Sequence, residues 1–157
     1  MLLLLLLQTS TPPLNLMCGG AGVANKVGVV SSYGQANAYG NVGGVPYSGQ
    51  ANGNVNTYYQ RQQGFGDQVD VRLFGGDDRI RLPRVMLPPL HGGNDGWFRL
   101  KNVVADERSI KAKAVVNFMN SPNIYIDRLS GTIRISGKAG DYSGTCQPVS
   151  LDAKPQF

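Results

Sequence analysis

The chain is short of the residues on which most enzymes depend. Its 157 residues include one histidine, His91, one glutamate and two cysteines, Cys18 and Cys146. It has no G-x-S-x-G nucleophile elbow, no C-x-x-C pair and no H-E-x-x-H zinc motif. We therefore assign no catalytic residue, no metal ligand and no cofactor from the sequence.

Charge is also scarce, and it is unevenly distributed. Charged residues make up 16% of the chain, and Lys26 is the only one among residues 1–60. The net charge is +5, but the fifteen basic residues are scattered and are interspersed with ten acidic ones. Because nucleic-acid binding needs basic residues clustered on one surface, we expect nucleic acid not to be the partner.

No apolar run is long enough to cross a bilayer as a helix, which takes about 20 residues. Residues 2–7 are leucines, and the sequence "QTSTPP" follows them. A short apolar block with a polar end is typical of a secretory leader, although no basic residue precedes it and no A-x-A follows. We predict a signal-like leader over residues 1–17 and a single β domain over residues 18–157, in the periplasm or secreted. The alternatives are a disordered apolar tail and a start codon placed a few residues late.

The two cysteines bear on the same question of compartment. In an exported protein Cys18 and Cys146 can form a disulfide, which would join the first strand to the last. The large residues Leu16 and Met17 precede Cys18, which argues against a lipid anchor, since lipidation sites have small residues there. If the protein stays in the cytosol, the alternative is a pair of free, buried thiols.

The chain is rich in short runs in which apolar and polar residues alternate. Such runs occur at residues 68–73, 110–118, 124–126 and 133–135, with turn sequences such as "GGDD" and "RLSG" between them. Asp127 and Arg128 enter the "RLSG" turn and are expected to pin it. No segment keeps a helical period over three turns. The sequence therefore predicts an all-β fold, a small antiparallel β-sandwich or barrel.

Residues 34–60 are rich in Gly and Asn, and part of the segment is repeated. The stretch "YGQANAYGNV" from Tyr33 resembles "SGQANGNVNT" from Ser48, which fits two neighbouring strands of a hairpin. The period of two places alternate residues on one face, which could bind sugars through amide and aromatic side chains. The candidate ligand-facing residues are Asn52, Asn54, Asn56, Tyr33, Tyr39, Tyr58 and Tyr59. The alternatives are a solvated face and a flexible excursion.

Two further candidates lie between the predicted strands. His91, in "LPPLHGGNDG", is the only imidazole and would be the general base of a hydrolase. The same loop could instead enter the cleft of a cell-wall hydrolase as an inhibitor. Trp97 could be a platform for a ligand or could pack at the core or its rim, because adjacent Trp97 and Phe98 face opposite sides of a strand.

The C-terminal part resembles a group of short exported proteins of alphaproteobacteria. The shared features are an "IDR-(S/T)-G-x-I-x-I-x-G" hairpin, here "IDRLSGTIRISG", followed by a strand that contains Tyr142, Gly144 and Cys146, and a final Phe157. The resemblance covers residues 66–157, and it implies export but no activity.

A second stretch, "MCGGAGVANKVGV", is similar to the start of the periplasmic lysozyme inhibitors of the membrane-bound C-type kind. Those proteins are small β-barrels with an early and a late cysteine. The Ser-Gly-Ser-Gly-Ala-type loop and the following Tyr through which they inhibit do not occur in this sequence.

Together these observations predict a non-enzymatic envelope or binding protein with no cofactor. Its candidate partners are an envelope glycan and a cell-wall protein. The alternatives are an inhibitor of a cell-wall hydrolase and a hydrolase that uses His91.

Overall fold

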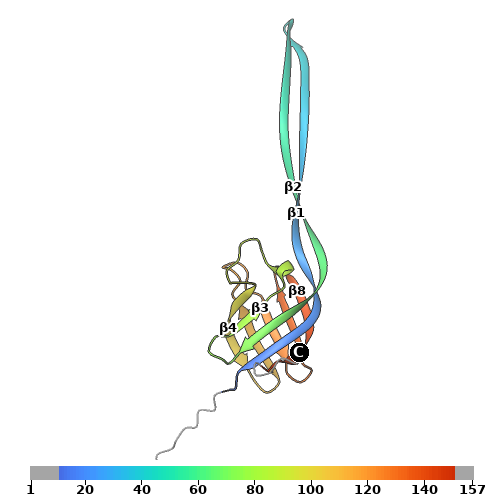
Figure 1. Ribbon diagram of the computed structural model, residues 1–157. Coiled ribbons are helices and arrows are strands. Elements are labelled where there is room, and N and C mark those ends of the chain that lie inside the picture. Colours follow the sequence, from blue (N-terminus) through green and yellow to red (C-terminus); the bar gives the residue numbers. More distant parts are fainter. Residues whose placement is uncertain (1–10, 151–157) are drawn as a thin grey trace, which may run out of the picture. The chain divides into compact units, whose positions relative to one another are not determined.

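The computed structural model describes residues 11–150 and confirms the all-β prediction. Within that part of the chain, eight antiparallel strands form one sheet, and the sheet closes into a ring because its first and last strands pair (Figure 1). Of the two predicted alternatives, the sandwich and the barrel, the closed ring corresponds to the barrel. None of the helical structure in residues 11–150 has the length and apolar character needed to cross a membrane.

The first two strands are much longer than the others. The strands are β1 (Leu14–Val42), β2 (Val45–Leu73), β3 (Arg79–Arg81), β4 (Trp97–Ala105), β5 (Ser109–Ala114), β6 (Asn123–Asp127), β7 (Thr132–Gly137) and β8 (Gly140–Pro148). A short 3-10 helix, η1 (Arg84–Met86), follows β3. The chain divides into two compact units. We call residues 11–25 and 63–150 the body, and Lys26–Gln62 the hairpin.

The core of the body is built from the alternating runs that the sequence shows. Along β5 the residues Ile110, Ala112 and Ala114 are buried, whereas the two lysines between them are exposed. The same alternation in β2, β6 and β7 turns one side of each strand inward. The other large buried side chains are Val69, Val71, Leu73, Ile80, Leu82, Met86, Phe98, Val116, Ile124, Ile126, Ile133, Ile135 and Tyr142.

The ring is closed by β1 and β8, and the predicted disulfide lies at this closure. Cys18 is opposite Cys146 in the register, and their sulfurs are bonded. The two strands approach closely, because a Cβ atom added to Gly20 would overlap the carbonyl oxygen of Ser143, and one added to Gly144 would overlap that of Gly19. Glycine is therefore required on both strands for this pairing.

Tyr142 of β8 ties the closure to the rest of the body. Its side chain is buried, and the single proton of its hydroxyl is shared between the carbonyl oxygens of Cys18 on β1 (3.0 Å) and Asp67 on β2 (2.9 Å). Its ring stacks on Phe65 of β2, with the ring centroids 6.2 Å apart. One side chain thus links three neighbouring strands of the ring.

The predicted hairpin turn between β6 and β7 is pinned by polar contacts. The backbone N–H groups of Ser130 and Leu129 donate hydrogen bonds to Asp127 Oδ1, and they hold the pKa of that carboxyl below its ordinary value. The guanidinium of Arg128 donates to the carbonyl oxygen of Asp106 (2.7 Å). The role expected for Asp127 is therefore confirmed, whereas Arg128 links this turn to the turn between β4 and β5.

Two further sequence expectations concern the position of Phe118 and the leader over residues 1–17. The inward row that begins at Ile110 ends at Val116, and Phe118 is 97% exposed because the chain turns at residues 117–120, where Asn117 accepts hydrogen bonds from two backbone N–H groups. The alternation over residues 110–118 predicts that Phe118 lies on the same side as Ile110, and this prediction is wrong. Residues 14–17 of the predicted leader belong to β1, where Leu16 pairs with Pro148. Residues 1–10 lie outside the described part, and the point of cleavage stays a prediction.

Removal of the disulfide is expected to weaken the body strongly. Cys18 and Cys146 are 128 residues apart in the sequence, and closing a loop of that length is worth about 5 kcal/mol in the chain-entropy treatment. The free energy of unfolding would be measured in urea for the oxidised protein, the reduced protein and the C18A/C146A variant. The reduced protein and the variant should both be less stable than the oxidised protein by about this amount. An unfolding midpoint unaffected by reductant would contradict this role.

Tyr142→Phe is expected to cost about 1–3 kcal/mol, because two backbone carbonyls lose their buried donor. Burial raises the pKa of Tyr142 above its ordinary value. The folded state therefore keeps this proton where the unfolded chain loses it, and stability falls as the pH rises above about 10. The free energy of unfolding in urea, measured between pH 8 and pH 11, should fall less with rising pH in the variant than in the native protein. Tyr125→Phe, on the exposed side of β6, is the control and should behave as the native protein does.

Candidate functional site

The hairpin is a two-stranded ribbon without a core of its own. It turns at Gly43 and Gly44, whose φ angles of 60° and 85° are those of a tight type I′ turn. Ser31 of one strand contacts Asn56 of the other, because its hydroxyl donates a hydrogen bond of 2.7 Å to Asn56 Oδ1. Nearly every residue of the unit is exposed, and no third strand pairs with it in residues 11–150, since β1 pairs with β8 only up to Ala24.

The two faces of the hairpin differ in chemistry. Ser31 and Asn56 lie on the same face, and the period of two adds alternate residues on each strand to it. These residues are mainly amides and tyrosines, and we call this side the polar face. Its main residues are Tyr33, Gln35, Asn37, Tyr39, Asn41, Gln50, Asn52, Asn54, Asn56 and Tyr58.

The opposite face is smooth and made mostly of glycine, alanine and valine. On it Tyr59 lies across Gly28 and Tyr47 lies across Gly40, because a Cβ atom added to either glycine would fall on the tyrosine ring. Tyr59 therefore faces away from the three asparagines, and it has a local packing partner. The tyrosines of the polar face are more exposed, at 67% for Tyr33, 78% for Tyr39 and 69% for Tyr58.

The structure therefore brings most of the predicted ligand-facing residues onto one surface. Asn52, Asn54 and Asn56 lie there with Tyr58 from their own strand. Tyr33 and Tyr39 come from the other strand. None of the six is buried, so this surface is accessible to a ligand.

His91 lies in the exposed loop between η1 and β4. Its Nδ1 is 2.9 Å from the carbonyl oxygen of Gly92, and its ring meets the edge of Phe98 with the centroids 5.8 Å apart. The shallow cavity beside it is lined by Pro89, Leu90, Asn117 and Phe118. These neighbours include no carboxylate and no hydroxyl, so the local geometry gives no support to a hydrolase based on His91. No cluster of three potential metal ligands occurs in residues 11–150.

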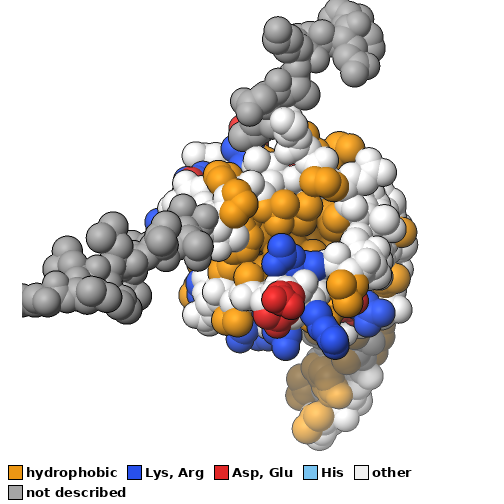
Figure 2. Space-filling model, turned by 90° about the horizontal axis from the view of Figure 1, so that it is seen from below, with side chains coloured by type: hydrophobic (Ala, Val, Ile, Leu, Met, Phe, Trp, Pro, Cys, Tyr) orange, Lys and Arg blue, Asp and Glu red, His pale blue; other side chains and the backbone are white. Residues whose placement is uncertain are grey.

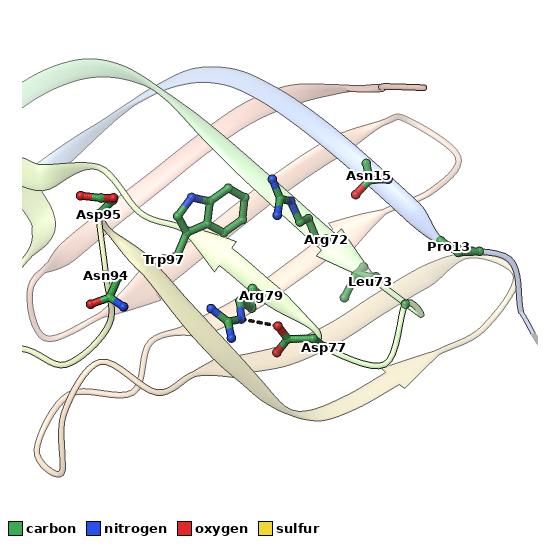
Figure 3. Close-up of a pocket in the computed structure, with 10 residues that line it drawn as sticks. Pro13, Asn15, Arg72, Leu73, Asp77, Arg79, Asn94, Asp95 and Trp97 are labelled. Atoms are coloured by element: carbon green, nitrogen blue, oxygen red, sulfur yellow. Dashed lines mark ion pairs between the residues drawn. The ribbon is translucent and has the colours of Figure 1, made fainter. Parts of the chain in front are cut away.

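Trp97 lies on the outer side of β4, whereas its neighbour Phe98 is buried. The guanidinium of Arg72 lies over the indole ring, with 4.5 Å between its Cζ and the ring centroid. Trp97 lines an open cavity of about 580 Å³ together with Arg72, Arg79 and Asp77 (Figure 3). Trp97 is thus at the rim of a cavity and not in the core.

Sequence reasoning missed the arginines around Trp97. Arg72, Arg79 and Arg99 lie on three different strands and are far apart in the chain, so only the register of β2, β3 and β4 brings them together. Each one does alternate with a buried apolar neighbour. That local signal places them on the outer side of the sheet but does not show that they are adjacent.

Comparison of the chain with protein-family models, with curated proteins and with solved structures finds no match in any of the three. The arguments on function therefore rest on the two surfaces described above, the polar face of the hairpin and the cavity at Trp97.

Proposed function

We propose that this protein is a non-enzymatic binding protein of the cell envelope, and that the polar face of the hairpin holds an uncharged glycan. The observation that carries the proposal is the alignment of exposed tyrosines and amides along one side of an otherwise coreless ribbon. A face without packing partners contributes little to the fold, so its chemistry is available for a ligand.

The side chains of this face suit sugars. Each Asn or Gln presents both donors and an acceptor, which match the hydroxyl and acetamido groups of a glycan. The tyrosine rings add flat apolar surfaces with a polar tip, against which the C–H side of a sugar ring can pack. Residues 27–60 carry no charge, which favours an uncharged glycan over an acidic one.

The disulfide is relevant to the cellular compartment in which the protein functions. A Cys18–Cys146 bond is consistent with a protein outside the reducing cytosol. We further propose that the chain is exported to the periplasm or secreted, as its leucine block and its resemblance to exported proteins also suggest. An inhibitor acting through "LPPLHGGNDG" stays an alternative, but that loop is held by hydrogen bonds such as the one from Asn117 Nδ2 to the carbonyl oxygen of Leu90 (2.8 Å).

Removal of two tyrosines from the polar face is expected to abolish most glycan binding. If each ring contributes about 1 kcal/mol, the Y33A/Y58A variant should bind at least about tenfold more weakly than the native protein. Isothermal titration with an N-acetylated sugar oligomer and co-sedimentation with insoluble cell-wall glycan would measure this. Val55→Ala, on the smooth face of the same strand, is the control and should bind normally. Equal binding by Y33A/Y58A and the native protein would contradict the proposal.

The unpaired edges of the hairpin favour a second candidate function, assembly with another copy of this chain. Both strands expose backbone N–H and C=O groups along an edge that has no third strand in the described residues, and such an edge is a template for strand addition. Residues 27–60 of the hairpin also lack the charges by which edge strands usually repel one another, and the two strands carry similar sequences. Strand pairing between two hairpins would satisfy these groups.

Self-association is expected to disappear when charge is placed on the hairpin. Val29 and Val55 are 53% and 63% exposed, so V29K/V55K should fold normally and stay monomeric at concentrations where the native protein associates. Leu129→Lys, at a turn of the body that is more exposed than either valine, should associate as the native protein does. Sedimentation velocity over a range of protein concentrations is the measurement. A native protein that is monomeric throughout would eliminate this second function.

A further inference from the structure

Three arginines lie side by side across neighbouring strands of the body. In the register Arg72 of β2 is directly opposite Arg79 of β3, which is directly opposite Arg99 of β4. Their neighbours Val71, Ile80 and Phe98 are buried, so all three arginines belong to the outer side of the sheet. Adjacent strands are about 4.8 Å apart, and like charges that face each other at this spacing are destabilising.

The carboxylates around the row do not neutralise it fully. Asp77 pairs with Arg79, with 2.6 Å between Oδ2 and Nε. Arg72 is held against Trp97, and Arg99 has no ion pair within residues 11–150. Asp95 lines the same cavity as Arg72 and Arg79. Asp70, which lines a smaller cavity with Arg72 and Trp97, is already paired with Arg81.

Open space lies over this row. The cavity of about 580 Å³ adjoins a second one of about 460 Å³, and the two share Arg79, Asn94 and Trp97. Arg72 lines the first cavity and Arg99 the second. We call the combined space the arginine groove. In Figure 3 Arg72, Arg79 and Trp97 are seen together along the first cavity.

We propose that the arginine groove binds an acidic polysaccharide. Guanidinium groups form paired, charge-assisted hydrogen bonds with carboxylates and phosphates, and three of them in a row fit a polymer whose acidic groups recur along its length. Asn94 and the edge of Trp97 supply the polar and apolar contacts that a sugar ring needs. Bound anions would also relieve the repulsion within the row.

Nucleic acid fits the groove less well. Single strands are usually held by several aromatic rings on which successive bases stack. The residues that line the groove include two aromatic ones, the half-buried Trp97 and the buried Phe98, so only Trp97 could stack on a base. Figure 2 shows one face of the molecule, where a hydrophobic hollow borders on a few Lys and Arg side chains and on an acidic residue, and this face is not uniformly basic.

The proposal does not rest on the polar face of the hairpin, and its test uses different residues and different ligands. Binding of the full-length protein to immobilised polygalacturonate, phosphomannan and neutral dextran would be measured by surface plasmon resonance. The first two probes distinguish carboxylate from phosphate as the acidic group. We expect the native protein to bind at least one of the two acidic polymers, and this binding should weaken as the salt concentration rises. Any binding to dextran should be the same for the native protein and the R72Q/R79Q/R99Q variant, because it does not involve the groove.

The variants separate the groove from the general basic charge. Arg99→Gln should weaken binding about tenfold, since one charge-assisted hydrogen bond is lost, and the triple variant should not bind. Arg134→Gln, which removes the same charge from the outer side of β7, is the matched control and should bind normally. Equal losses in R99Q and R134Q, or tighter binding to single-stranded DNA than to either acidic glycan, would overturn the proposal. Unchanged near-ultraviolet circular dichroism would show that the variants fold.

Discussion

The pairing of β1 with β8 is the contact on which the body depends. This pairing removes both edges of the sheet, so the body has no edge strand to which another chain could add a strand. The disulfide between Cys18 and Cys146 and the hydrogen bonds of Tyr142 lie at this closure. The register of β2, β3 and β4, and with it the row of arginines, is therefore held in a closed frame.

Within residues 11–150 the hairpin, in contrast to the body, has unpaired edges and no core. A two-stranded ribbon without a core is marginally stable in water, and this one gains stability only from its tight glycine turn, its cross-strand hydrogen bonds and the rings of Tyr47 and Tyr59 over glycines. A long segment with so little internal packing gains further stability from whatever binds it. This is why we place the principal binding function on the hairpin.

Much of the body could be predicted from the sequence, because its signals are local. Alternation identified the inward rows of β2, β5, β6 and β7, and a pair of cysteines far apart in a chain that we expected to be exported predicted the disulfide. Phe118 was misplaced because the polar contacts of Asn117 turn the chain, which alternation does not detect. The arginine groove depends on strand register over long sequence distances. The faces of the hairpin were predicted for the asparagines, but the tyrosines of the other strand needed the cross-strand pairing.

Amide hydrogen exchange of the full-length protein, followed by mass spectrometry, tests the central claim most directly. The exchange rates would be compared with and without an uncharged cell-wall glycan. The account predicts rapid exchange within Lys26–Gln62 in the free protein, because the segment has no core. It also predicts slower exchange there once the glycan is bound, with β5, β6 and β7 unchanged. Protection that appears only in the body, while the hairpin exchanges as before, would contradict it.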